Sequence, residues 1–381
     1  MGFFDDFVSE TDAMFRQTAR RFAEREIRPH VDRWEEAGEF PRQLYEKAAE
    51  AGLLGVGFPE EYGGSGGGPM AIVMVIEGLM RGGSTGVAAG LGSLGIALPP
   101  LVQSGDEHLI DEFVRPALAG DKICALAITE PGTGSDVAAV STRARRDGDD
   151  YVVDGAKMFI TSGVRADFLT VLVRTDDDPH GGLSFLVIET DREGVSQSSP
   201  LKKHGWCASD TAEIGFDGVR VPADNLVGDE GEGFVTLMRN FQNERLALAA
   251  YGVATAQIAF EEARSYAEER EAFGRPIAKF QVNRHKLVDM KTRITSARTF
   301  LYQVATRMEA GDYPVEQVSM AKNIAAELAV DVCYEAVQLH GGAGYMRDTL
   351  VERLHRDARL LPIGGGTQEI MKEIIARQMG L

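Results

Sequence analysis

The feature that most constrains the fold is the spacing of apolar side chains, which changes twice along the chain. Residues 1–120 and 230–381 repeat apolar positions every three or four residues, as amphipathic helices do. Residues 121–229 instead form short β-rich runs separated by Gly and Asp turns. The last helical segments run for about 25–30 residues, which is typical of a bundle with faces left for subunit contacts. The sequence therefore predicts an α+β chain with an N-terminal α-helical domain, a middle β-domain and a C-terminal α-helical bundle.

Some boundaries within these blocks can be predicted from local signals. The apolar spacing over 5–27 suits one amphipathic helix, and Pro41 suits the first turn of the next. The run RDGDDYVVDG predicts a β-hairpin that turns at Asp147–Asp150. The glycine-rich segment 62–70 predicts a loop before another helix.

Composition and charge exclude several classes of protein. The 381 residues are 44% hydrophobic and 26% charged, so a core of this size needs no metal or disulfide to hold it. The net charge of −18 repels phosphate backbones and argues against nucleic-acid binding. We expect no membrane span, because no run of about 18 apolar residues occurs, and no signal peptide, because the N-terminus is acidic. Three widely spaced cysteines fit a reduced, cytoplasmic compartment, and neither they nor the seven histidines show metal-ligand spacing.

Two motifs in the β block could hold a flat or anionic ligand. AITEPGTGSDVAA (127–139) is a strand end followed by a glycine-rich turn, which exposes backbone N–H groups and small hydroxyls. It lacks the GxGxxG pattern of a dinucleotide site, and a plain loop explains it equally well. GAKMFITSG (155–163) is a strand that could offer an aromatic face and one hydroxyl to a planar heterocycle. By itself it is more readily an ordinary edge strand.

Two further motifs lie in the C-terminal block. QLHGGAGY (338–345) could be a simple helix stop, or its glycines could let a cofactor approach the backbone. PIGGGTQEIM (362–371) places three glycines before a helix, with Thr367 near its N-cap. Such an entry into a helix N-terminus suits an anionic or carbonyl oxygen.

Together these segments resemble the acyl-CoA dehydrogenase family: TEPGTGSD, KMFITSG, the run from ERLALAAYG to AFGRPI, QLHGGAGY and GGGTQEIMKEIIARQ. The resemblance runs in order through essentially the whole chain. It implies the fold of that family, with an N-terminal helical domain, a central β-barrel-like domain and a C-terminal four-helix bundle. It also implies one FAD per subunit, a homotetramer built as a dimer of dimers, and electron transfer to an electron-transferring flavoprotein.

The reaction implied by the resemblance is the α,β-dehydrogenation of an acyl-CoA thioester to a trans-2-enoyl-CoA. A base removes the α-proton, and the flavin N5 accepts the β-hydride. Hydrogen bonds to the thioester carbonyl must stabilise the enolate-like charge by several kcal/mol, because a carboxylate alone is too weak a base for an unassisted α-proton.

The resemblance implies Glu244 as the base. Many members of the family carry a Glu directly before the Gly-Thr of the last motif, but here Gly365 precedes Gly366 and Thr367. The long-chain and isovaleryl types place the Glu on the first helix of the C-terminal bundle instead, where FQNERLALA supplies Glu244. Gly365 would leave room for that carboxylate and could still donate its N–H to the thioester carbonyl. From the residues alone, Glu244 is more readily a solvated or ion-paired residue beside Arg245; as a catalytic base it should have a pKa raised by burial.

The remaining roles are implied by the same resemblance, position by position. Residues expected at the flavin are Leu126, Ile128, Thr129, Gly134, Ser135, Phe159 (often Trp in the family) and Thr161. Residues expected to reach the FAD of a neighbouring subunit are Arg270, Phe273 and Gln281, and those expected on the adenine side are Gln338, Gly341 and Gly342. The last FAD contacts expected are Thr367 and Glu369. Residues expected to bind the substrate are Ser135, Arg245, Gly365 and Gly366.

Several alternatives stay open on the sequence. The protein could be a dehydrogenase or an oxidase for a branched, cyclic or steroid-derived acyl-CoA, or a catalytically silent assembly subunit. The stretch 84–101 is rich in small residues and could line the acyl slot. Its glycines Gly90, Gly92 and Gly95 would then leave depth for a long or bulky acyl group, or they could simply permit tight helix packing.

Overall fold

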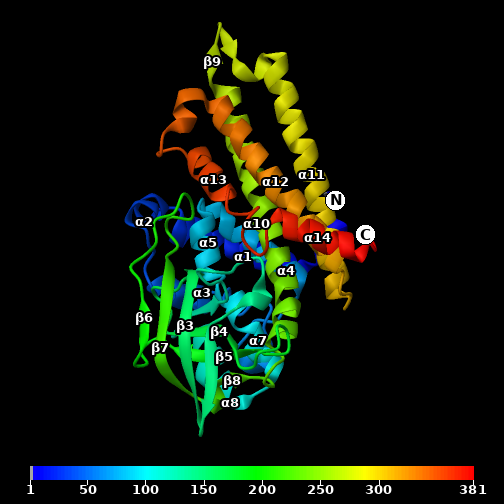
Figure 1. The fold of residues 1–381 in the computed structure, drawn as a ribbon. Helices are drawn as coiled ribbons and strands as arrows, with labels where there is room; N and C mark the ends of the chain where they lie inside the picture. Colours follow the sequence, from blue (N-terminus) through cyan, green and yellow to red (C-terminus); the bar gives the residue numbers. More distant parts are fainter. Residues whose placement is uncertain (1–2) are drawn as a thin grey trace.

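A computed structural model describes residues 3–381, and it confirms the predicted α+β architecture (Figure 1). Helices form the first part of the chain, strands the middle and helices the last part. In Figure 1 the sheet occupies one end of the molecule, and α10, α11 and α12 project from the other. The first helices, including α1, α4 and α5, lie between these two ends.

The N-terminal helices are short and closely packed. The first helix begins later than predicted, because Ser9 caps it: the Ser9 Oγ accepts from the Asp12 N–H at 3.1 Å, and the Asp12 carboxylate accepts from the Ser9 N–H at 3.3 Å. Residues 23–27 continue it as a wider turn. The helices of this part are α1 (Glu10–Phe22), α2 (Val31–Ala37), α3 (Gln43–Glu50), α4 (Pro69–Leu79), α5 (Thr85–Leu91), α6 (Leu94–Ala97), α7 (Pro99–Ser104), α8 (Glu107–Leu109) and α9 (Arg115–Leu118).

The middle part forms one mixed sheet of eight strands in the order β6-β7-β3-β2-β4-β5-β8, with β1 pairing β4 in parallel. The predicted hairpin is confirmed, since β2 and β3 pair from Asp147 opposite Asp150. The strands are β1 (Cys124–Ala127), β2 (Arg143–Asp147), β3 (Asp150–Thr161), β4 (Phe168–Arg174), β5 (Leu183–Glu189), β6 (Val195–Gln197), β7 (Thr211–Pro222) and β8 (Leu226–Val227).

The central strands are buried on both faces, which explains their nearly continuous apolar sequences. In β4, Phe168 and Leu172 join the core shared with the helices, whereas Leu169, Val171 and Val173 join a separate core inside the sheet. Successive side chains of a strand point to opposite faces of the sheet, so one face of this sheet packs against the helical part. The ends of β1 and β3 are thereby fixed against the helices.

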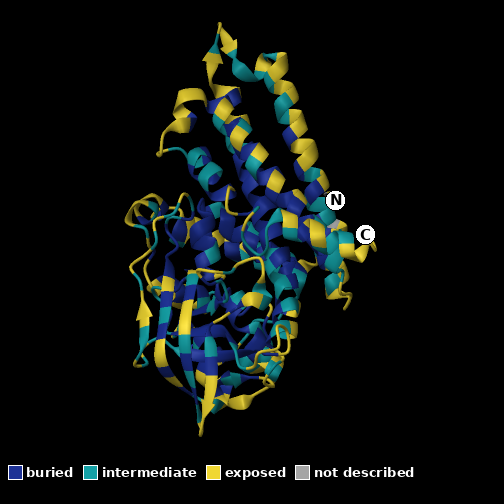
Figure 2. Cartoon of the chain, viewed as in Figure 1, coloured by how far each residue is buried: buried dark blue, intermediate teal, exposed yellow. Residues whose placement is uncertain are grey.

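The C-terminal part is built around α10, whose 37 residues exceed the 25–30 expected for the helices of this block. Residues 248–260 of this helix are all buried, so its middle is enclosed by neighbours (Figure 2). It crosses α12 at Gly252, where an added Cβ would lie 2.6 Å from the Ala325 carbonyl oxygen. The elements are α10 (Gly233–Glu269), β9 (Glu271–Ala272), β10 (Arg275–Pro276), α11 (Gln281–Glu309), α12 (Val315–His340), α13 (Leu350–Ala358) and α14 (Gln368–Gln378).

Within residues 3–381, no single helix is both long and apolar enough to cross a membrane. One pair of segments, 85–91 and 94–104, meets the length and composition requirement only when joined, and it is bent by 46°.

Candidate active site

A cavity of about 1270 Å³ lies where the N-terminal helices, the sheet and the bundle meet. Its inner wall includes Ile72, Val75, Ile76 and Leu79, which the three- and four-residue spacing places on one face of α4. The exposed basic side chains at its rim are Lys202, Arg359 and Arg377. Since ordinary ligand pockets measure roughly 300–1,000 Å³, this volume suits a large ligand or two ligands side by side.

The cavity brings together most of the site residues predicted from the sequence. Those that line it come from β1 and the loop after it, from β3, from α10 and from the loop before α14, segments that lie far apart in the chain. They are Leu126, Ile128, Thr129, Gly134, Ser135, Phe159, Thr161, Glu244, Arg245, Gly365, Gly366 and Thr367.

Glu244 presents a sequestered carboxyl group to this cavity. Its Oε2 is inaccessible to solvent and has no hydrogen-bond partner within residues 3–381. Burial raises the pKa of Glu244 to about 7, although the nearby charges of Arg245 and Lys322 oppose the rise. The solvated or ion-paired alternative therefore does not describe this side chain. A carboxyl group with a pKa near neutrality is suited to accept and release a proton.

Gly365 lies directly against Glu244. Its φ of +63° belongs to the left-handed region that favours glycine. A Cβ added at Gly365 would lie 2.4 Å from Leu248 Cδ1 and 3.4 Å from Glu244 Oε1. A side chain at position 365 and the carboxyl group of Glu244 would therefore compete for the same space, as the sequence analysis inferred.

Two cations bind carbonyl groups of the glycine loop, residues 364–366. Arg245 Nε donates to the Gly365 carbonyl at 3.3 Å, and Lys322 Nζ donates to the Gly366 carbonyl at 2.6 Å. The Arg245 guanidinium also lies over the Phe241 ring, 5.3 Å from its centroid. After the loop, the Thr367 hydroxyl accepts from the Ile370 N–H and caps α14, as predicted. Sequence analysis missed Lys322, although a lysine four residues after Val318 lies on the apolar face of its helix.

The strand side of the cavity is open and aromatic. The β3–β7 register shifts between Lys157 and Ile160, and within this bulge Phe159 has a φ of +61° and is 62% exposed. The Met158 N–H donates to the Thr129 carbonyl at 2.7 Å, which joins the end of β1 to this bulge. The exposed Phe159 lines the cavity together with Thr129 and Thr161, and one aromatic ring beside two hydroxyl-bearing residues fits a flat polar heterocycle.

A buried ion pair anchors the loop after β1. Lys157 Nζ lies 2.8 Å from Glu130 Oε1 and 3.0 Å from the Ile128 carbonyl oxygen. Burial alone would raise the pKa of Glu130, but Lys157 and hydrogen bonds from Ser141 and Thr142 outweigh it and lower the pKa to about 2. Because every partner is buried or hydrogen-bonded, this pair stiffens the turn that begins at Thr129.

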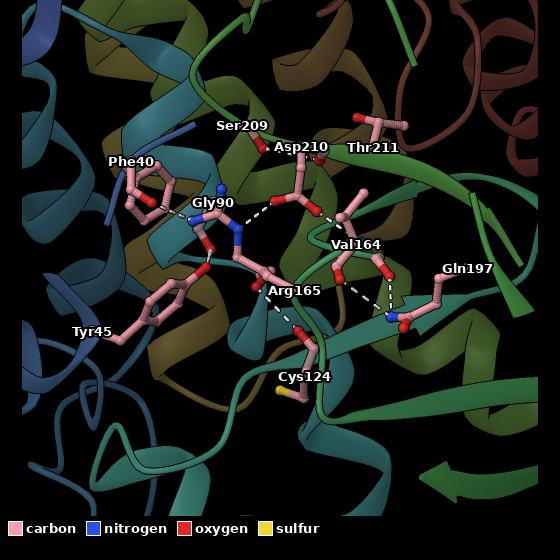
Figure 3. A network of polar contacts seen from close by, with 12 residues as sticks. Phe40, Tyr45, Gly90, Cys124, Val164, Arg165, Gln197, Ser209, Asp210 and Thr211 are labelled. Atoms are coloured by element: carbon pink, nitrogen blue, oxygen red, sulfur yellow. Dashed lines mark hydrogen bonds and ion pairs between the residues drawn. The ribbon is translucent and has the colours of Figure 1, made fainter. Parts of the chain in front are cut away.

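A second polar network ties the end of β3 to the N-terminal helices (Figure 3). Arg165 pairs with Asp210, donates to the Phe40 carbonyl at 2.9 Å and lies over the Phe40 ring at 4.3 Å. Asp210 also accepts from the Val164 N–H at 2.8 Å. The turn that follows Thr161 is therefore held on both sides, which keeps the strand side of the cavity in place.

The three glycines of the predicted acyl slot have different surroundings. A Cβ added at Gly95 meets no atom within 4 Å, so Gly95 faces open space in the cavity wall. At Gly92 it would lie 3.0 Å from the Tyr251 hydroxyl oxygen, and at Gly90 it would lie 2.7 Å from the Phe40 ring. Gly90 does not line the cavity and serves close packing, so the slot interpretation is wrong for that residue.

Seven other predicted residues do not line the cavity, and their roles stay predictions. All are exposed, and six lie near the far ends of α10, α11 and α12; Phe273, in the β9–β10 hairpin, is 96% exposed. These residues are Arg270, Phe273, Gln281, Gln338, Gly341, Gly342 and Glu369.

The chain is similar to known proteins both in sequence and in structure. Three family models match in order: acyl-CoA dehydrogenase N-terminal domain over residues 9–121, middle domain over 125–219 and C-terminal domain over 231–380. The chain is 41% identical over 376 residues to the mitochondrial long-chain specific acyl-CoA dehydrogenase of Sus scrofa, covering 98% of this chain and 87% of that protein.

Solved structures agree with these matches. A probable acyl-CoA dehydrogenase from Mycobacterium abscessus superposes with a TM-score of 0.96 at 52% identity, covering 98% of this chain and 100% of that one. A glutaryl-CoA dehydrogenase from Mycobacterium smegmatis, solved in complex with FADH2, superposes with a TM-score of 0.93 at 26% identity, covering 98% and 96%.

Proposed function

Since the chain belongs to the acyl-CoA dehydrogenase family, we propose that this oxidoreductase converts an acyl-CoA thioester to its trans-2-enoyl-CoA with Glu244 as the base. One observation carries the assignment: the carboxyl group of Glu244 is sequestered, finds no partner for Oε2 among the described residues and lies beside the glycine loop. Among the described residues, the other acidic side chains that line the cavity are Asp136 and Glu373, and both are exposed.

Glu244 and Gly365 have different roles in proton removal. The carboxylate accepts the α-proton, and its pKa of about 7 keeps it a usable base near neutral pH. The backbone N–H of Gly365 donates to the thioester carbonyl and stabilises the charge that develops there. One such donor in a dry site contributes about 3 kcal/mol to the barrier. Removal of the proton and stabilisation of the carbonyl thus occur on neighbouring groups.

The strand side of the cavity fits FAD, which members of this family use. Its ring system would be held by the residues that surround the open space beside the bulge of β3. These are Leu126, Ile128, Thr129, Phe159 and Thr161. Gly134 and Ser135 would lie beside both ring and thioester. FAD, when bound, would accept the hydride from the β-carbon, so that one proton and one hydride leave the substrate as the C=C bond forms.

The inner wall favours an unsubstituted apolar acyl group. The side chains from α4 that line it are all aliphatic, and Gly95 adds open space. A charged or polar acyl terminus there would lose its hydration without gaining a partner. We therefore propose a long or bulky hydrocarbon acyl group as the substrate, with branched, cyclic and steroid-derived groups as the alternatives.

Electrons would pass to an electron-transferring flavoprotein, and copies of the chain would assemble as a homotetramer. The far end of the bundle supports self-assembly, since Phe273, Val282, Tyr345 and Met346 expose large apolar surfaces there. A second copy would cover these side chains, and Arg270 of each copy would then reach the FAD site of its neighbour. A silent assembly subunit is disfavoured by the carboxyl group of Glu244, whose raised pKa has no structural use.

Anaerobic addition of butyryl-, isovaleryl- and palmitoyl-CoA to the purified flavoprotein tests the proposal. We expect palmitoyl-CoA to bleach the visible flavin band and Glu244→Gln to abolish bleaching while retaining flavin. Bleaching of the variant at the wild-type rate would refute Glu244 as the base. A yellow protein that no acyl-CoA bleaches would favour the silent subunit, and rapid oxygen consumption by the reduced protein would favour the oxidase.

A further inference from the structure

Lys322 of α12 is a buried lysine that proton removal, as described above, does not use. Its side chain is 0% exposed, and its ammonium group donates to the Gly366 carbonyl at 2.6 Å. Lysine is almost never fully buried without a partner for its charge. The partner of Lys322 is a carbonyl of the loop that carries the proposed donors, and its charge also acts on Glu244 of α10.

The hydrogen bonds from Lys322 and Arg245 orient two consecutive peptide planes. Arg245 draws the Gly365 carbonyl toward the bundle, and Lys322 draws the Gly366 carbonyl the same way. No cis peptide occurs within residues 3–381, and in a trans peptide the C=O and the following N–H point in opposite directions. The N–H groups that follow these carbonyls, those of Gly366 and Thr367, therefore point away from the cations, toward the cavity that the loop lines.

The donor groups of the loop have no use inside the protein. Within residues 3–381, the N–H groups of Gly365, Gly366 and Thr367 make no backbone hydrogen bond. Both glycines have positive φ, +63° and +97°, so without external restraint the loop could relax into other backbone conformations open to glycine. The bonds to the two carbonyls restrain the loop to one of them, together with the backbone bonds from the Gly364 N–H to the Leu360 carbonyl and from the Gln368 N–H to the Pro362 carbonyl.

Resting on the proposed function, we infer that Lys322 is a positioning residue of the reaction: by holding the Gly366 carbonyl, it fixes the peptide plane of the Thr367 N–H directly and, through the loop backbone, keeps the Gly365 N–H aimed at the thioester carbonyl. The ammonium does not touch the substrate. It acts through the loop, and together with Arg245 it makes the donor site rigid before the substrate arrives.

The charge of Lys322 has a second effect on the same site. The charged and titratable groups that face it or its neighbour are Glu244 and Arg245 of α10, Glu369 of α14 and Tyr313 before α12. Burial and the Arg245 charge lower the pKa of Lys322 to about 8, whereas Glu244 and Glu369 raise it. Its positive charge also lowers the pKa of Glu244. Loss of the ammonium should therefore shift the ionisation of the base to higher pH.

Lys322→Met tests the inference, because methionine fills similar space without the ammonium. Replacing a buried charge by an apolar side chain is often neutral for stability, so we expect the variant to fold and to retain flavin. Asn323→Leu is the matched control. Asn323 Nδ2 donates to the Gln368 carbonyl at 3.1 Å, so this change loosens the start of α14 without affecting the two loop carbonyls.

The first readout needs no turnover: a 3-aryl-acryloyl-CoA is bound to the oxidised flavoprotein, and its near-UV absorption is recorded. Hydrogen bonds that polarise the carbonyl move this band to longer wavelength. We expect the wild-type protein, Asn323→Leu and Glu244→Gln to show the shift, and Lys322→Met to lose most of it. Lys322→Gln, which keeps an N–H donor without the charge, should retain more of the shift than the Met variant.

The second readout is the rate of anaerobic flavin reduction as a function of pH. We expect Lys322→Met to lower the limiting rate by about 100-fold, the effect of losing one oxyanion donor, and to raise the apparent pKa of the base. A Lys322→Met protein with the wild-type band shift and pH profile would overturn the inference. If instead no acyl-CoA reduces the wild-type flavin, the proposed function fails first.

Discussion

Glu244→Gln should make the protein more thermally stable above neutral pH while it abolishes flavin reduction. The reason is burial, which raises the pKa of Glu244 from 4.5 to about 7; within residues 3–381 its Oε2 has no hydrogen-bond partner that would favour the charged form. Between these two values the unfolded chain releases a proton that the folded chain retains. Folding stability therefore falls as pH rises through this window, and the loss is complete once Glu244 ionises in the folded state.

The size of the effect follows from the same two pKa values. Each pH unit between them lowers the free energy of unfolding by about 1.4 kcal/mol for one proton, so the full window amounts to about 3 kcal/mol. Glutamine has nearly the same shape and is neutral at every pH. The variant should therefore match the wild-type protein near pH 4 and exceed its stability by up to about 3 kcal/mol at pH 8. For a chain of 381 residues this corresponds to a rise in Tm of about 4 °C.

The assay is calorimetry of the flavin-loaded wild-type and variant proteins from pH 4 to pH 8.5. Glu130→Gln is the control of opposite sign, because the ion pair with Lys157 lowers the pKa of Glu130 to about 2. The stability that Glu130 contributes is present above its unfolded pKa and is lost as pH falls toward 2, so Glu130→Gln should lower Tm at pH 7. A Glu244→Gln protein whose difference in Tm does not grow with pH would refute the reasoning.

Three further changes test the walls of the site. Gly95→Leu should change the free energy of unfolding by no more than about 1 kcal/mol, since a Cβ there meets open space. It should reduce flavin bleaching by palmitoyl-CoA more than by butyryl-CoA, and an unchanged preference would show that Gly95 does not line the acyl slot. Gly365→Ala should lower the free energy of unfolding in urea by about 2 kcal/mol or more, because its Cβ would lie 2.4 Å from Leu248 at a φ of +63°, and a neutral result would contradict the described loop. Asp210→Asn should lower it by about 3 kcal/mol, because Arg165 loses its buried partner; a loss below about 1 kcal/mol would show that the network in Figure 3 is not needed to hold the sheet.

The order of the elements could be predicted from the sequence because it depends on local periodicity. The change from helical to strand spacing near residues 120 and 230 follows from which side chains must face a core, and all strands of the eight-stranded sheet lie between Cys124 and Val227. The ends of individual helices were less predictable. Ser9 moves the start of α1 because a hydroxyl and a carboxylate exchange hydrogen bonds with the backbone, a local choice that apolar spacing does not report.

The contacts that make the site were beyond what periodicity can predict. Glu244 and Gly365 lie 121 positions apart, and Lys322 meets Gly366 from a third segment, so no window of sequence contains their juxtaposition. Only the resemblance placed Glu244 and Gly365 together, and it did not include Lys322. Similarly, Gly90 and Gly95 are both small residues in one short stretch, yet Phe40 covers the first and leaves the second open.

The arrangement around Glu244 reconciles two demands that oppose each other. A dry cavity strengthens hydrogen bonds to the thioester carbonyl, but the same dryness favours the protonated form of the base. Arg245 and Lys322 offset part of that penalty, since both charges oppose the rise in the pKa of Glu244. Because these cations also bind the carbonyls of Gly365 and Gly366, they serve the base and the donor loop at once. Removing either cation should therefore impair both functions together, whereas a substitution that only loosens packing should separate them.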